Sequence, residues 1–297
     1  MDIARYRAFV QAVDKGSLSQ AARALHYTPS GVSQLISALE RDLGFAVLDR
    51  SKQGVRITTC GETLLPIARA IVQEEDRLLE VSGEINGVTI GSVTIGSYPS
   101  VATNWLPRVI KKFHLAYPDI EIRVMEGIHQ EIDEWLRSYQ VDVAFLTMSP
   151  NLPYEWTPLA LDPMVAILPP DHPLAGAERY PLERVVDEPF IMPGLGHDVD
   201  TMRMLDEHGI KPHIVVETIE NASMLAMIEE GMGMSVVNSL LTERLDFNVA
   251  KVPVEPEAAT LFGIATLSRE NASPAVQHFI SHAIEQLDQM GFDNGQA

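Results

Sequence analysis

The chain has 297 residues and a formal net charge of −19, from 22 Lys and Arg against 41 Asp and Glu. Its length allows two domains or more, no run of about 18 uncharged apolar residues predicts a membrane span, and the single cysteine, Cys60, excludes an internal disulfide. The first residues also lack the pattern of a signal peptide, so we expect a cytoplasmic protein with no membrane partner.

The negative charge is not spread evenly along the chain. Residues 1–60 contain eight Lys and Arg against five Asp and Glu, a charge of +3, which leaves −22 for residues 61–297. A small basic unit beside an acidic remainder is typical of a protein that binds nucleic acid through one domain only. Because a charge of +3 gives weak binding on its own, we expect two such units to be held together.

Residues 18–37 have the pattern of a helix-turn-helix. Ser17 is a suitable N-cap for a short first helix, and Thr28 followed by Pro29 starts a second helix that Gly44 ends. The second helix has one apolar face and one face of short polar side chains, which suit phosphate oxygens and base edges in a major groove. The predicted DNA contacts of this recognition helix are Thr28, Pro29, Ser30, Ser33, Gln34 and Ser37. The alternative is that this second helix is only a solvated surface helix and not a recognition helix.

A short hairpin is predicted directly after this helix. Residues 46–48 and 55–58 read as two strands, with a polar tip between them. The basic residues of this wing are predicted phosphate contacts: Arg50, Lys52 and Arg56. A basic wing beside two short helices favours DNA binding over a surface helix.

Three motifs follow one another in the first 61 residues. They are Phe9-x-x-x-Val13-x-x-Gly16-Ser17-Leu18-x-x-Ala21-Ala22-x-x-Leu25, Thr28-Pro29-Ser30-x-Val32-Ser33-x-x-Ile36-x-x-Leu39-Glu40-x-x-Leu43-Gly44, and Leu48-Asp49-Arg50 with Val55-Arg56-Ile57-Thr58-x-x-Gly61. This run resembles the winged helix-turn-helix of the LysR-type transcriptional regulators, and the length and layout of the remaining chain fit that family as well.

The resemblance implies a sequence-specific DNA-binding transcriptional regulator whose activity is modulated by a small-molecule effector. It implies an N-terminal all-α winged helix-turn-helix at 1–60, a linker and dimerisation helix at 61–88, and a C-terminal α/β effector-binding domain at 89–297. The C-terminal domain is expected to have two lobes, like a periplasmic binding protein, with the effector bound between them. Expected partners are double-stranded DNA, the effector, further copies in a homodimer or homotetramer, and the transcription machinery.

The segment after the wing predicts a long helix. Thr59 as N-cap with Glu62 three residues later fits a capping box, and apolar side chains then recur at spacings of three and four as far as Ile85. Glu75 interrupts this seam, and Pro66 is expected to kink the helix or lie near its start. A helix packed against its own effector domain would show a similar pattern, whereas the resemblance favours a dimerising linker.

Strands and helices alternate from residue 92 onward, which predicts parallel α/β sheets. Strands are expected at 92–96, 120–124, 141–146, 164–168, 190–192, 213–216, 234–237, 249–252 and 261–265. In the second half of the chain helices are expected at about 199–208, 221–230, 239–245 and 274–290. The resemblance assigns about 89–160 and 266–297 to lobe I and about 161–265 to lobe II.

Ligands of open α/β sheets bind beyond the carboxyl ends of the strands. This rule selects five segments as walls of a cleft: 97–103, 127–129, 147–149, 193–197 and 220–223. The predicted effector contacts within them are Ser97, Ser100, Thr103, Thr147, Gly194 and Asn221. Each of these alone is better explained by an ordinary structural role such as a helix cap, but as a group they suggest a site for a small organic acid or amino acid.

The sequence contains no convincing catalytic or metal-binding pattern. His197-Asp198-x-Asp200 and His129-x-Glu131 lack a strong ligand spacing, and Cys60 has no resolving partner for a redox role. We therefore expect no enzyme, no bound metal and no cofactor other than the effector. The alternatives are a solute-binding protein or enzyme whose N-terminal helices merely mediate assembly, and a nucleoid-type DNA binder without an effector.

Overall fold

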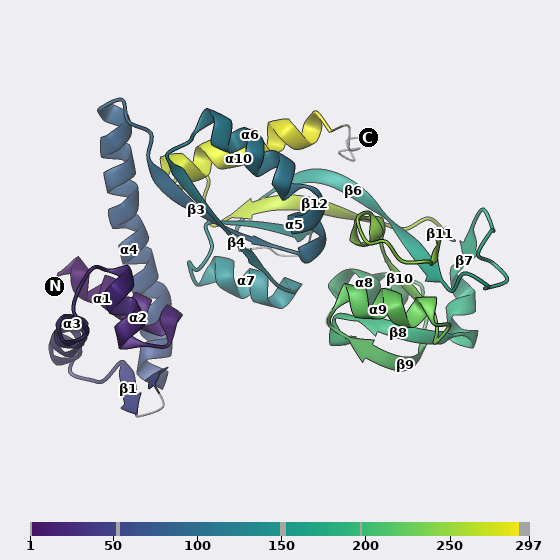
Figure 1. Ribbon diagram of the computed structural model, residues 1–297, viewed down its shortest axis with the longest axis horizontal. Helices are drawn as coiled ribbons and strands as arrows, with labels where there is room; N and C mark the ends of the chain where they lie inside the picture. The colour runs from purple at the N-terminus through teal and green to yellow at the C-terminus, as the bar shows by residue number, and fades with distance from the viewer. Residues whose placement is uncertain (1, 52–53, 149–152, 197, 291–297) are drawn as a thin grey trace.

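The computed structural model describes residues 2–51, 54–148, 153–196 and 198–290. It shows a small N-terminal unit joined by a long helix to two α/β lobes (Figure 1). This arrangement confirms the predicted fold class, a winged helix-turn-helix and long helix followed by a two-lobed α/β part.

Three helices form the body of the N-terminal unit: α1 (Ile3–Lys15), α2 (Leu18–Ala24) and α3 (Pro29–Leu43). At the start of α3 the Thr28 hydroxyl accepts a hydrogen bond of 3.1 Å from the Gly31 N–H, and Gly44 ends the helix in the left-handed conformation with φ 81°. The apolar face of α3 is completely buried against the other two helices through Val32, Ile36 and Leu39. The predicted caps and the predicted apolar face are therefore confirmed.

The predicted hairpin is present as β1 (Leu48–Ser51) and β2 (Gly54–Ile57), which pair antiparallel. The Val55 N–H donates a hydrogen bond of 3.3 Å to the Gly16 carbonyl, which holds the wing against the end of α1. The tip of the hairpin, including the predicted contact Lys52, lies outside the described residues.

The long helix α4 (Thr59–Ile85) has 27 residues and contains Pro66. Its N-cap is Thr58, so the prediction of Thr59 was wrong by one residue. The Thr58 hydroxyl accepts a hydrogen bond of 3.0 Å from the Gly61 N–H and donates one of 2.9 Å to the Ala46 carbonyl. The second bond selects Thr58 because it ties the start of α4 to the base of the wing, a contact that local spacing does not reveal.

The two halves of α4 have different surroundings. Apolar side chains of the first half join the core of the N-terminal unit: Leu64, Leu65, Ile71 and Val72. In the second half Leu78, Leu79 and Ile85 are 67%, 56% and 80% exposed. The predicted apolar seam is therefore internal to the chain in its first half and open to solvent in its second half.

Lobe I contains three parallel strands with β3 in the middle, and helices that pack on the sheet (Figure 1). Its elements are β3 (Gly91–Ser97), α5 (Pro99–Asn104), α6 (Leu106–Ala116), β4 (Ile120–Glu126), α7 (His129–Arg137), β5 (Val143–Thr147) and α10 (Pro274–Asp288). Its core contains the large buried side chains Trp105, Phe113, Phe145 and Phe279.

Lobe II consists of short strands, two α-helices and 3-10 turns. Its elements are β7 (Tyr180–Pro181), η1 (Leu182–Asp187), β8 (Pro189–Pro193), η2 (Gly194–Gly196), α8 (Val199–Glu207), β9 (His213–Thr218), α9 (Asn221–Glu229), β10 (Ser235–Asn238), η3 (Ser239–Thr242) and β11 (Ala250–Glu255). The predicted helix at 239–245 was wrong, because only the short turn η3 forms there. The buried carboxylate of Asp162 anchors this turn by accepting hydrogen bonds from the Ser239 hydroxyl at 2.8 Å and the Leu240 N–H at 3.1 Å.

Two long antiparallel strands, β6 (Glu155–Leu168) and β12 (Ala259–Thr266), run from one lobe into the other. The sequence predicted a strand over the second half of β6, and the resemblance implied two crossover strands near 158–163 and 260–267, which are present as β6 and β12. In the fold Pro158 pairs with Gly263 directly beside a shift of register, an irregularity that accommodates a residue without an N–H.

Polar side chains attach α4 to lobe I. The Gln73 amide donates a hydrogen bond of 2.8 Å to Asp142, and the Glu80 carboxylate accepts one of 3.2 Å from the Ala275 N–H. Burial raises the pKa of Asp142 to about 6. The helix is therefore packed on its own effector domain, as the alternative interpretation held, and also exposes an apolar face.

The tight contact between Gly61 of α4 and Val47 at the base of the wing gives a stability prediction. A Cβ at Gly61 would lie 2.2 Å from the Val47 carbonyl oxygen, so Gly61→Ala should destabilise the N-terminal unit by about 1–3 kcal/mol. Thermal unfolding followed by circular dichroism would measure the change. Gly176→Ala is the matched control, because a Cβ there meets no atom within 4 Å; equal midpoints for the two variants would contradict the prediction.

Candidate functional site

The polar face of α3 lies on the surface of the N-terminal unit. Thr28, Pro29, Ser30 and Gln34 are exposed, and Ser33 and Ser37 are half-buried at its margin. The Thr28 and Ser30 hydroxyls lie 3.0 Å apart and form a hydrogen bond. Of the six side chains that the sequence selected on this helix, four are therefore exposed and two are partly accessible.

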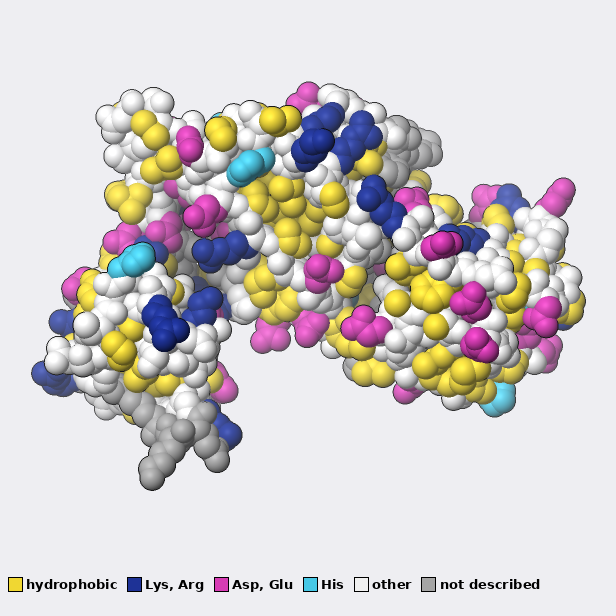
Figure 2. Space-filling view, in the orientation of Figure 1, with side chains coloured by type: hydrophobic (Ala, Val, Ile, Leu, Met, Phe, Trp, Pro, Cys, Tyr) yellow, Lys and Arg dark blue, Asp and Glu magenta, His cyan; other side chains and the backbone are white. Residues whose placement is uncertain are grey.

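Basic side chains accompany this polar face. Arg56 on β2 is exposed, whereas the side chain of Arg50 and all of Lys52 lie outside the described part of the chain. Figure 2 shows several Lys and Arg side chains over the N-terminal unit, with few Asp and Glu near the wing. Among its described residues this unit presents a helix of short polar groups and one basic side chain of the hairpin, Arg56, an arrangement that fits a DNA groove and its flanking phosphates.

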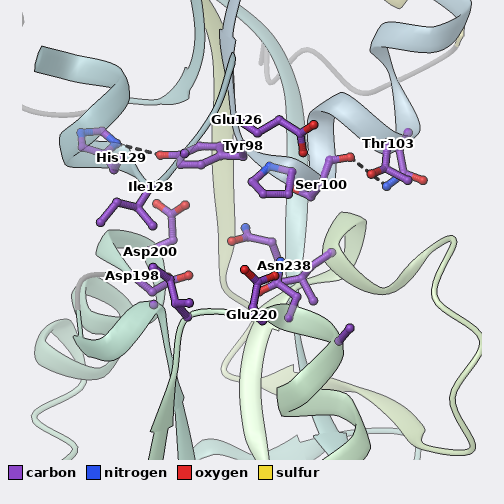
Figure 3. Close-up of a pocket in the computed structure, with 18 of the residues that line it drawn as sticks. Tyr98, Ser100, Thr103, Glu126, Ile128, His129, Asp198, Asp200, Glu220 and Asn238 are labelled. Carbon is purple, nitrogen blue, oxygen red and sulfur yellow. Dashed lines mark hydrogen bonds between the residues drawn. The ribbon is translucent and has the colours of Figure 1, made fainter. Parts of the chain in front are cut away.

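A second candidate site is a cavity of about 450 Å³ between the lobes (Figure 3). Lobe I contributes the ends of β3 and β4 and the start of α5, and lobe II contributes the starts of α8 and α9 and the residues around η3. A volume of this size is in the range that holds a small organic molecule. The cavity lies beyond the carboxyl ends of strands, where the sequence predicted it.

The predicted effector residues divide into two groups. Ser100, Thr103, Gly194 and Asn221 line the cavity. Ser97 and Thr147 are fully buried behind Tyr98 instead and do not line it. The Ser97 hydroxyl donates a hydrogen bond of 3.0 Å to the Tyr98 carbonyl, and the Thr147 hydroxyl lies 3.3 Å from the Tyr98 hydroxyl. Ser97 and Thr147 therefore support Tyr98, which forms part of the cavity wall.

Tyr98 and His129 form one corner of the cavity. The Tyr98 hydroxyl lies 2.7 Å from Nδ1 of His129, and the two rings are stacked. Burial raises the pKa of Tyr98 and lowers the pKa of His129, so both side chains are uncharged at neutral pH. The sequence selected the segments of both residues but gave no reason to prefer these side chains to their hydroxyl-bearing neighbours.

Asp200 and Arg203 lie at the seam between the lobes. The Arg203 guanidinium, on α8 of lobe II, donates hydrogen bonds of 3.0 Å to Asp200 and 2.9 Å to the Met148 carbonyl, which follows β5 in lobe I. Burial, with the neighbouring negative charge of Asp198 as the second cause, raises the pKa of Asp200 to about 7. In the sequence, Asp198 and Asp200 belong to a pattern with only weak metal-ligand spacing. In the fold, both residues line the cavity.

Comparison with known families identifies both parts of the chain. Residues 3–62 match the bacterial regulatory helix-turn-helix proteins of the lysR family, and residues 86–288 match the LysR substrate binding domain. The two matches contain the polar helix and the cavity, respectively. The chain belongs to the LysR-type transcriptional regulators, DNA-binding proteins with an effector-binding domain.

Individual relatives match over nearly the full chain. The uncharacterized HTH-type transcriptional regulator YvbU of Bacillus subtilis is 27% identical over 288 residues, 96% of this chain and 98% of YvbU. Full-length OxyR of Pseudomonas aeruginosa superposes with a TM-score of 0.79 at 20% identity, covering 97% of this chain and 94% of OxyR. Full-length CbnR in complex with its target DNA has a TM-score of 0.57 at 19% identity, with 97% and 99% covered. Among the described residues no helix is long and apolar enough to cross a membrane.

The pKa of Asp200 predicts a dependence of stability on pH. Between pH 5 and pH 7 the unfolded chain, with a carboxyl pKa near 3.8, has released this proton, whereas the folded protein retains it. The free energy of unfolding therefore falls by about 1.4 kcal/mol for each unit that the pH rises in this window. The substitution Asp200→Asn should remove that contribution.

Urea unfolding at pH 5 and pH 7, followed by circular dichroism, would measure the difference. Asp206→Asn, an exposed change on the same helix, is the control and should keep the full pH dependence. An Asp200→Asn variant with the same loss between pH 5 and pH 7 as the control would contradict the assignment.

Proposed function

We propose that this regulator binds an interrupted palindrome as a dimer, with α3 in the major groove, and that an effector between the lobes controls the spacing of its DNA-binding units. The proposal rests on the arrangement of the chain in two functional parts. One part has an exposed polar recognition face, the other has a ligand-sized cavity, and α4 contacts both. The expected setting is the cytoplasm, where the transcription machinery would be a further partner.

The DNA contacts divide into two kinds. Ser33, Gln34 and Ser37 are placed along α3 to reach base edges, and Thr28, Pro29 and Ser30 are placed at its start to meet phosphate oxygens. Arg50, Lys52 and Arg56 of the wing would contact flanking phosphates. What supports this division is the position of each side chain relative to the buried face of α3 and to the hairpin.

Dimerisation would use the second half of α4. Leu78, Leu79 and Ile85 give that half an apolar surface that its own chain leaves exposed, and two such helices side by side would cover it. A pair of DNA-binding units then raises the effective affinity of each weakly basic unit. Further contacts between effector domains would build the tetramer.

Coupling between effector and DNA would pass through α4. The buried Arg69 guanidinium pairs with Asp14 of α1 and donates a hydrogen bond of 2.9 Å to Gln140 of lobe I. A change in the closure of the lobes would alter how lobe I sits in the assembly and thereby move the units that α4 carries. In the cavity the proposed effector contacts are Ser100, Thr103, Gly194 and Asn221, while Ser97 and Thr147 support Tyr98.

A genomic binding selection with the purified protein at about 150 mM salt tests the function, because screening at that ionic strength suppresses weak non-specific binding. Recovery of an interrupted palindrome is expected. Recovery of random fragments, or of no DNA, would contradict sequence-specific regulation.

Two substitutions separate base reading from phosphate binding. Gln34→Ala should relax the preference at one position of the half-site, with a loss of about 1–3 kcal/mol in discrimination. Arg56→Ala should weaken binding to all sequences alike and lower the slope of log K against log salt by about 1. Titrations of matched and mismatched duplexes at several salt concentrations would measure both, with Gln289→Ala as a control. An equal loss on every sequence for Gln34→Ala would remove it from the base-reading set.

The dimer is tested on the exposed half of α4. Leu79→Glu should shift the protein toward monomer and reduce DNA affinity by about tenfold or more, because a charge in an apolar interface is poorly tolerated. Analytical ultracentrifugation would report the mass, with Glu74→Gln on the same helix as the control. If the Leu79→Glu variant keeps the oligomeric mass of the unchanged protein, the proposed position of the dimer interface is wrong.

A further inference from the structure

The wall of the interlobe cavity is rich in negative charge. Its described lining residues include a single guanidinium, Arg244, the carboxylates of Glu126, Glu131, Asp198 and Glu220 from both lobes, and Asp200, whose pKa of about 7 leaves it partly protonated at neutral pH. Figure 3 shows Glu126 above the cavity and Asp198, Asp200 and Glu220 below it. A ligand in this space meets carboxylates from opposite sides.

Three of these carboxylates already have partners within the fold. Asp198 accepts a hydrogen bond of 2.9 Å from the Thr201 N–H, Glu131 accepts one of 3.0 Å from the Ile128 N–H, and Asp200 is bound to Arg203. Glu126 of lobe I and Glu220 of lobe II are different, because neither carboxylate forms a hydrogen bond or an ion pair with another described residue.

Two buried amides in the same wall also have an atom without a partner among the described residues. Asn104 is 7% exposed and donates hydrogen bonds of 2.9 Å each to the Ser100 and Leu240 carbonyls, so its Oδ1 is left as an acceptor. Asn238 is 8% exposed, and its Nδ2 is left as a donor. Buried polar atoms are nearly always hydrogen-bonded, so both atoms require a polar partner, which a bound water or a polar group of a ligand in the cavity supplies.

The apolar part of the wall suits the body of an organic molecule. Tyr98 and Phe262 meet edge to face with their ring centres 5.8 Å apart, and both line the cavity together with Ile128, Ile219 and Leu245. An uncharged aromatic ring also attracts a cation to its face, and Tyr98 is uncharged at neutral pH.

We propose that the effector is a small organic cation, an amine whose ammonium group lies between Glu126 and Glu220 and whose apolar part lies against Tyr98 and Phe262. This inference rests on the proposed function, in which the cavity is the effector site, and gives that effector a chemical class. The hydroxyl groups alone suggested an organic acid or an amino acid, and the amine differs from the first and shares its ammonium group with the second.

The charge distribution also gives the amine a role in lobe closure. When the lobes approach each other, the carboxylates of lobe I and lobe II come closer and repel, with an energy that grows as water leaves the cavity. An ammonium group between them converts this repulsion into attraction from both sides. It therefore binds the closed arrangement better than the open one, which is the condition for a ligand to shift a conformational equilibrium. An organic dicarboxylate would add to the repulsion.

Calorimetric titration of the purified full-length protein with matched pairs of probes tests the class. Putrescine is compared with succinate, and tyramine with 4-hydroxyphenylacetate, so that each pair has a similar skeleton with ammonium or carboxylate groups. At least one amine is expected to bind and neither acid. Binding of an acid without either amine, or of no probe at all, would overturn the proposal.

Variants locate the amine within the cavity. The double substitution Glu126→Gln with Glu220→Gln should weaken amine binding by about tenfold or more, because it removes the two unpaired carboxylates and preserves their shape. Glu230→Gln, at the opposite end of α9 from Glu220, should leave the affinity unchanged. Equal affinity for the double variant and the control would overturn the assignment.

DNA binding measured on the same samples separates this proposal from the proposed function. Selective binding to the recovered palindrome without amine binding would overturn the amine and leave the regulator standing. Loss of sequence-selective DNA binding would instead remove the proposed function on which the amine rests.

Discussion

The buried guanidinium of Arg69 is the point at which the three parts of this regulator meet. It lies on α4, is 5% exposed, pairs with Asp14 of the DNA-binding unit and donates a hydrogen bond to Gln140 of lobe I. A buried charge is costly unless it is paired, so these contacts have to be kept together when the chain folds. Burial also lowers the pKa of Arg69, an effect that Asp14 opposes. Arg69 therefore helps to fix the relative position of the DNA-binding unit and lobe I, together with the contacts of Gln73 and Glu80.

A second arginine, Arg203, joins two parts of the structure at the seam between the lobes. Arg203 reaches from α8 to the Met148 carbonyl of lobe I, while the carboxylates of the cavity wall face each other across the same gap. The hydrogen bond from Arg203 to lobe I favours closure of the lobes. Repulsion between carboxylates on the two walls of the cavity opposes it. A ligand that alters this balance would act on lobe I, and through Arg69 and Gln73 on α4. In this way a charge distribution in one domain can influence DNA binding in another.

The predictions that succeeded and those that failed differ in the range of the interactions involved. The Thr28 cap, the Gly44 stop and the apolar face of α3 were correct because they depend on side chains within one or two helical turns. Thr58 replaced Thr59 as N-cap because of a bond to Ala46, and the short turn η3 formed in place of the predicted helix at 239–245 because Asp162 of a distant strand holds it.

The sequence by itself determined the class of this protein: caps, helical periodicity, glycine stops and the basic wing are local features, and they specify a winged helix-turn-helix without reference to the rest of the chain. The rule for strand ends also located the segments around the cavity. Only the tertiary structure decided which side chains of those segments face the ligand. It turned Ser97 and Thr147 inward behind Tyr98 and gathered Glu126, Asp200 and Glu220 around one space. These carboxylates are far apart in the sequence, so the charge of the cavity exists only once the two lobes are folded against each other.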